Sequence, residues 1–174
     1  MNTPEKTPVL QTLRMLVGAT VAALFLMAVA LMFVLGFGPP DLWAVVLLLI
    51  LGAVMYALLE TVGYRARPIS RELPPEQVRE AAVASFRSSV MLRLSLAESV
   101  ALVGLVLAFV AGRTVLLYDV GAAVSVLLLA VHVWPSVRTV DKVVAGLEQD
   151  GARTGLRELL GFGGHPDGPV TRLG

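Results

Sequence analysis

Some ionisable side chains lie within otherwise apolar stretches of this sequence, where such groups are costly and are usually paired or functional. Glu98 lies in "RLSLAESVALVGLVLAFVAG", His132 lies near the end of the last apolar stretch, and Glu60 lies near the end of the second. Glu98 is about 7 Å inside Arg93 at 1.5 Å per helical residue. A buried carboxylate and an imidazole can bind a proton or a cation. With Arg14 and Arg93, we expect these groups to form one polar layer.

Two interpretations of Glu98 stay open. In the structural one, Glu98 makes an ion pair or a hydrogen bond with Arg14 on the neighbouring helix or with His132, and the pair orients the helices. In the functional one, Glu98 binds a proton or cation, and His132 shares or relays the proton. Its shallow depth favours the structural interpretation, because a side chain near the interface can reach water.

The elements that must position these residues are four apolar runs. They span Leu16–Phe37, Leu42–Val62, Leu94–Ala111 and Val115–Trp134. Each approaches the roughly 20 residues that a helix needs to cross a hydrocarbon core about 30 Å thick. The sequence predicts an all-α integral membrane protein, a four-helix bundle of two hairpins.

Basic residues predict the orientation. "GFGPPD", between the first two runs, contains no Lys or Arg, whereas the segment between the second and third runs contains Arg65, Arg67, Arg71, Arg79 and Arg87. Cytoplasmic segments carry the excess of Lys and Arg in membrane proteins. We therefore expect a multi-pass protein of the plasma (inner) membrane with both termini in the cytoplasm.

These patterns divide the chain into five segments. We predict a cytoplasmic N-terminus at 1–15, transmembrane hairpins at 16–62 and 92–135, a basic cytoplasmic loop at 63–91, and a cytoplasmic tail at 136–174 that is disordered at its end. The fourth helix is expected to continue past Pro135, and a short amphipathic turn is expected around Leu156–Leu160.

The central loop has the pattern of an amphipathic helix. Pro75 and Glu76 are typical of a helix start, and Val78, Ala82 and Phe86 recur at helical spacing. We predict a helix from about Pro75 straight into the third span. Its apolar face either lies on the inner leaflet or against neighbouring helices, or it docks a cytoplasmic partner.

The two predicted hairpins resemble each other. Leu13–Val34 and Leu92–Val110 both open with Leu-Arg and end in Phe-Val, and Gly36 and Gly112 follow them. Asp41 and Asp119 are placed as N-terminal caps of the second helix of each hairpin. Both copies start on the same side, so we predict a parallel internal repeat.

The stretch "LAESVALVGLVLAFV" resembles the outer-helix motif of the rotor-ring proteolipid of rotary ATPases. The chain is also similar to small four-helix bacterial membrane proteins with an Arg-x-x-Leu-x-Glu motif, here Arg93 to Glu98. The first resemblance implies that Glu98 is a proton-binding position. The chain departs from rotor proteolipids in its long basic central segment, its long tail and a first helix with only Gly18 before Gly36.

Composition excludes several classes of function. There is no cysteine, and the net charge of +1 gives no electrostatic case for a nucleic-acid partner. Neither a phosphate-binding loop nor a metal-ligand spacing occurs, so no enzyme, cofactor or metal is predicted. Small residues (Gly18 and Ala22; Ala97, Ala101 and Gly104) form helix faces that permit close packing. We expect a non-enzymatic membrane protein that self-associates or is an accessory subunit; the alternative is a proton- or cation-coupled carrier or pore using Glu98 and His132.

Overall fold

The computed structural model describes residues 8–64, 68–70, 72–134, 136–149 and 153–162. The chain divides into two compact units. The span unit comprises residues 15–63 and 90–134, and the terminal unit comprises the described residues among 1–14, 64–89 and 135–174. The predicted N-terminal segment 1–7 and the predicted disordered end, 163–174, lie outside the described residues.

Within the part of the chain that the structure describes, four helices are long and apolar enough to cross a membrane. They are α1 (Pro8–Val34), α2 (Leu42–Thr61), α3 (Pro75–Val110) and α4 (Val115–Leu128), which a π-helical turn, η1 (Leu129–Val133), continues. These helices expose many large apolar side chains, among them Phe25, Phe33, Leu42, Trp43, Ile50, Leu102 and Val110. An exposed apolar surface of this size is typical of helices that face lipid or another membrane helix. The all-helical fold and the four predicted spans are confirmed, and the chain is a multi-pass membrane protein.

Helix α4 packs closely against α3 because two glycines face each other. A Cβ atom added to Gly121 would lie 2.9 Å from the Val100 carbonyl oxygen and 3.1 Å from the Cα of Gly104. The Ala101 amide also donates to the Ser125 hydroxyl, at 2.9 Å. Small residues allow this approach, which maximises dispersion contacts where hydrophobic driving force is lacking.

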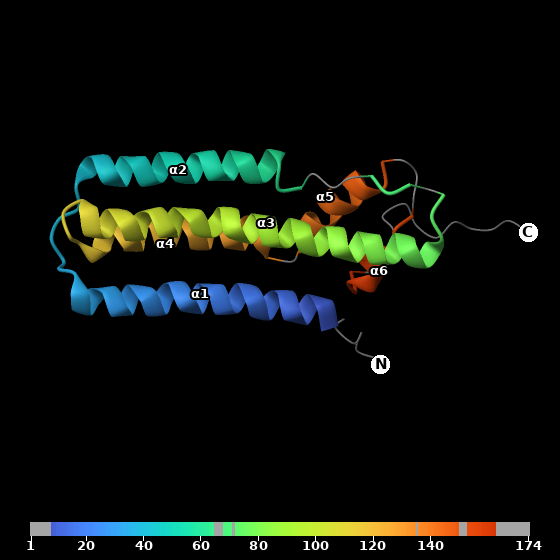
Figure 1. Ribbon diagram of the computed structural model, residues 1–174, viewed down its shortest axis with the longest axis horizontal. Helices are drawn as coiled ribbons and strands as arrows, with labels where there is room; N and C mark the ends of the chain where they lie inside the picture. The colour runs from blue at the N-terminus through green and yellow to red at the C-terminus, as the bar shows by residue number, and fades with distance from the viewer. Residues whose placement is uncertain (1–7, 65–67, 71, 135, 150–152, 163–174) are drawn as a thin grey trace, which may run out of the picture. The chain divides into compact units, whose positions relative to one another are not determined.

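The other two spans flank this pair, and Figure 1 shows α2 on one side of α3 and α4 and α1 on the other. Gly52 of α2 faces Val124 of α4, where an added Cβ would lie 2.6 Å from the valine Cγ1. Helix α1 meets α4 through Tyr118, whose hydroxyl donates to the Leu24 carbonyl at 3.0 Å. Helix α4 therefore contacts each of the other three spans.

The two short turns, which join α1 to α2 and α3 to α4, meet at one end of the spans. The Val115 amide donates to the Gly36 carbonyl at 3.1 Å, and the Thr114 hydroxyl donates to the Gly38 carbonyl at 2.7 Å. Helices α1 and α3 end two residues before Gly36 and Gly112, as predicted. Gly112 has a φ of 77°, which glycine adopts without the steric cost of a Cβ.

The predicted cap at Asp119 is wrong. Asp119 lies inside α4, and the N-cap is Thr114, whose side chain accepts from the Leu116 amide at 3.3 Å. Asp41 is the N-cap residue of α2, without a side-chain hydrogen bond. The aspartates therefore do not occupy equivalent cap positions, and the internal repeat stays a prediction.

Helix α3 begins at Pro75 and runs without interruption to Val110, as predicted. Its early apolar residues Val78, Ala82 and Phe86 are buried, so protein rather than lipid covers that face. A proline in the first turn sacrifices no intrahelical hydrogen bond, which suits it to a helix start.

The predicted extension of the fourth helix past Pro135 is wrong. Trp134 has φ −56° and ψ 123°, outside the helical region, because a following proline disfavours helical geometry in the residue before it. A new helix, α5 (Val137–Leu147), begins after Ser136, whose side chain accepts from the Thr139 amide in a capping box.

The terminal unit has its own apolar core. It buries Ile69, Val78, Ala82, Phe86, Val140, Val143, Leu147, Leu156 and Leu160. The Ile69 amide donates to the Leu147 carbonyl at 3.1 Å, and Arg157 of α6 (Leu156–Leu159) pairs with Asp141 at 2.8 Å. The short helix expected around Leu156–Leu160 is confirmed.

Candidate functional site

The π-helical turn η1 positions His132 at the end of the fourth span. The Trp134 amide donates to the Leu129 carbonyl at 2.9 Å, which closes the wider turn. His132 is fully buried there. The imidazole thus lies in the last turn of a helix, where the negative end of the helix dipole stabilises a positive charge.

Arg93 of α3 binds the main chain of the same turn. Its Nη1 donates to the His132 carbonyl at 2.7 Å, and the side chain is completely buried. Gly63, just after α2, makes room for it, because a Cβ there would lie 2.9 Å from the Arg93 Cγ. The guanidinium thus supplies a charge-assisted hydrogen bond to a carbonyl at a helix C-terminus.

Helix α2 contributes a carboxylate and an aromatic ring to His132. Glu60 Oε1 lies 3.8 Å from His132 Nδ1, and the Tyr56 ring meets the imidazole edge to face, with centroids 4.9 Å apart. The His132 side chain is 1% exposed and that of Glu60 is 29% exposed. We call Tyr56, Glu60, Arg93 and His132 the His132 cluster. It joins three helices of the span unit.

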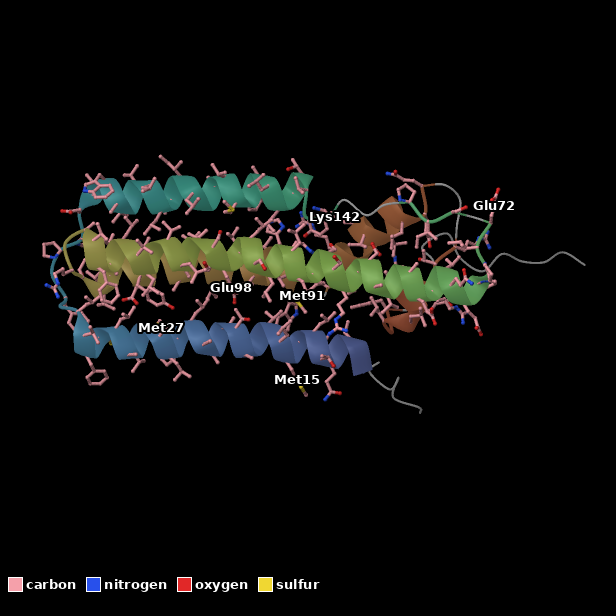
Figure 2. The ribbon with its side chains drawn as sticks, viewed as in Figure 1. Met15, Met27, Glu72, Met91, Glu98 and Lys142 are labelled. Atoms are coloured by element: carbon pink, nitrogen blue, oxygen red, sulfur yellow. The ribbon has the colours of Figure 1, made fainter. Side chains whose placement is uncertain are left out.

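Glu98 lies apart from the His132 cluster. It is half-buried on α3 and makes no hydrogen bond or ion pair with another residue of the span unit. Figure 2 shows it on the side of α3 that faces α1. The neighbouring Ser99 hydroxyl donates to the Leu96 carbonyl of its own helix, at 2.8 Å. The predicted contact between Glu98 and His132 is therefore absent; Arg14 belongs to the terminal unit, and its pairing with Glu98 stays a prediction.

The two small-residue faces have different environments. Ala97, Ala101 and Gly104 are buried in the span unit, where Gly104 faces Gly121. Gly18 and Ala22 of α1 are exposed, and a Cβ added at Gly18 would meet no atom of the described chain within 4 Å. One predicted packing face is thus used inside the molecule, and the other is open.

Sequence reasoning placed Glu60 in the polar layer but did not pair it with His132. The available signal was the spacing of Tyr56 and Glu60, four residues apart and hence on one face of α2. Hydropathy does not show towards which neighbouring helix that face of α2 is turned. The contact between Glu60 and His132 could therefore be seen only in the structure.

Among the described residues, no group of three or more His, Asp or Glu side chains is placed to hold a metal ion. No protein-family model matches this chain, and neither a curated protein nor a solved structure matches it significantly. Function must therefore be argued from the chain's own residues.

Proposed function

We propose that this chain is a small, non-enzymatic integral membrane protein that acts by association, either with itself or as an accessory subunit of a membrane complex. The observation that carries the proposal is the open small-residue face of α1, formed by Gly18 and Ala22. Between Val17 and Leu31, no residue of α1 is fully buried. Helix α1 therefore has a large surface available to another helix.

The packing of α3 on α4 indicates what such a face can do. There, Gly104 and Gly121 bring two helix backbones into contact. In a bilayer, helices associate through close packing of this kind, because lipid tails are as apolar as the side chains. Gly18 would allow a second helix to pack equally closely against the exposed face of α1.

Gly18→Leu tests the proposal in lipid bilayers, with self-association measured by energy transfer between labelled copies. The bulky side chain should weaken association about tenfold by separating the helix backbones. Ala30→Leu is the matched control: Ala30 is exposed on α1 but lies about 120° around the helix from Gly18. The control should change association less than about twofold.

Equal weakening by the two substitutions would contradict a specific face. If the wild type is monomeric in bilayers, self-association is refuted. The accessory role then requires a co-purifying membrane protein that Gly18→Leu releases and Ala30→Leu retains.

The proposed setting is the plasma membrane, with both termini in the cytoplasm. The arginines between α2 and α3 support this orientation, because basic segments stay on the cytoplasmic side. The lipid bilayer itself is the first partner, since it covers the exposed apolar side chains of the four spans.

A second candidate function is a proton- or cation-coupled carrier or pore. It is favoured by the ionisable groups that the span unit holds within its helices, namely the His132 cluster and the half-buried Glu98. The resemblance of the Glu98 stretch to rotor proteolipids supports Glu98 as a proton-binding position. Loss of pH-driven ion flux in Glu98→Gln, at unchanged expression and oligomeric state, would favour this function over association.

A further inference from the structure

Binding of one proton to His132 would turn the contact between Glu60 and His132 into an ion pair. At 3.8 Å, Glu60 Oε1 and His132 Nδ1 are farther apart than the roughly 2.7–3.2 Å of a hydrogen bond. At this distance, a neutral imidazole interacts only weakly with a carboxylate. An imidazolium is attracted strongly, because charges interact more strongly in a buried, low-dielectric site than in water.

The surroundings of His132 provide for a positive charge. Among the described residues, the titratable and charged groups that face it include Glu60 and Tyr56 of α2 and Arg93 of α3. The positive charge of Arg93 disfavours a second positive charge on His132, but Arg93 Nη1 donates to the His132 carbonyl. Glu60 offsets that charge, and the C-terminal end of the helix favours a cation at His132.

The exposure of the two partners provides a route for the proton. Glu60 is 29% exposed, whereas His132 is 1% exposed. Because Glu60 is one residue from the end of α2, a proton from the membrane surface can reach the carboxylate first and then the buried imidazole. Both groups are one residue from the end of their helices, since α2 ends at Thr61 and η1 ends at Val133.

We propose that Glu60 and His132 form a proton-binding site, in which the bound proton creates an ion pair that holds α2 against the end of the fourth span. Hydronium gives up the proton and becomes water, the proton binds to the His132 imidazole, and no other bond changes. The site is independent of the association proposed above and does not involve Glu98.

The test uses nitrogen NMR of the imidazoles in the full chain in lipid nanodiscs. The chain has two histidines, so His165→Gln leaves one imidazole signal. Between about pH 8 and about pH 5, the His132 signal should change from neutral to imidazolium. In Glu60→Gln, the proton affinity of His132 should fall about tenfold, because the negative charge of the Glu60 carboxylate has been removed.

Asp41→Asn is the matched control. It removes a carboxylate from the same unit, but one at the N-cap of α2, at the other end of that helix from Glu60. It should change the proton affinity less than about twofold. If Asp41→Asn and Glu60→Gln act equally, the assignment of Glu60 is overturned. If His132 stays neutral at about pH 5 in the otherwise native chain, the site itself is overturned, whether or not Glu60→Gln folds.

A double-mutant cycle tests the mechanical part of the proposal. Glu60→Gln and His132→Gln should be coupled at about pH 5, by at least about fivefold in the unfolding equilibrium constant. The ion pair exists only when His132 is protonated, so the coupling is present at low pH and is lost as the pH rises. Coupling that is equal at about pH 8 would contradict the proton-dependent ion pair.

Discussion

Gly121→Ala is expected to destabilise the span unit, because the added methyl group has no space. A Cβ at Gly121 would lie 2.9 Å from the Val100 carbonyl oxygen and 3.1 Å from the Gly104 Cα, and both are main-chain atoms. Main-chain atoms cannot rotate away, so α3 must move outward by about half an ångström to restore ordinary contact. The same movement stretches the 2.9 Å hydrogen bond from the Ala101 amide to Ser125.

The expected cost can be estimated from its two parts. Overpacking a well-packed interior costs about 1–3 kcal/mol. Replacing glycine by alanine in a helix regains at most about 1 kcal/mol, and less where the unfolded chain stays helical in the membrane or micelle. We therefore expect a net loss of about 1–2 kcal/mol in the free energy of unfolding.

The assay is reversible unfolding in mixed micelles of a mild and a denaturing detergent, followed by tryptophan fluorescence. Gly18→Ala is the matched control, since the same chemical change is made where an added Cβ meets no described atom within 4 Å. It should leave stability unchanged or raise it slightly. The packing argument is refuted if Gly121→Ala is as stable as the wild type, or if the two substitutions destabilise equally.

Three other substitutions probe single contacts. Arg93→Met removes the guanidinium from the His132 carbonyl and should cost about 1.5–3 kcal/mol in the same assay; an unchanged midpoint would exclude a stabilising role. Ser136→Ala removes the capping box with Thr139 and should cost about 1 kcal/mol, seen as faster amide exchange confined to α5. Tyr118→Phe removes the hydrogen bond to α1 and should cost about 0.5–1.5 kcal/mol, and a wild-type melting temperature would count against it.

The spans were predictable because hydropathy and length are properties of one helix at a time. The start of α3 at Pro75 and the helix ends before Gly36 and Gly112 follow from such local signals. The start of α1 was not predicted, because the helix begins at Pro8 and the first apolar run begins only at Leu16. The cap of α4 was not predicted correctly. Both Thr114 and Asp119 are cap-forming residue types, and only the geometry shows that the chain turns at Thr114.

The His132 cluster depended on information that no single helix contains. Its formation requires the rotation of α2, which brings Glu60 round to His132, and the wider turn at η1. A change of one residue in register rotates a helical side chain by about 100°. Sequence alone therefore left Arg14 and His132 as alternative partners of Glu98, and the structure pairs His132 with Glu60 instead.

Because α4 contacts each of the other three spans, assembly of the span unit depends on the segment that the ribosome makes last of the four. Until Val115–Val133 is synthesised, Gly104 has no Gly121 to meet, Gly52 has no Val124, and the carbonyl that Arg93 binds does not exist. During synthesis the first three spans therefore lack these contacts until the fourth enters the membrane, and a chain that ends before Val115 could not form them.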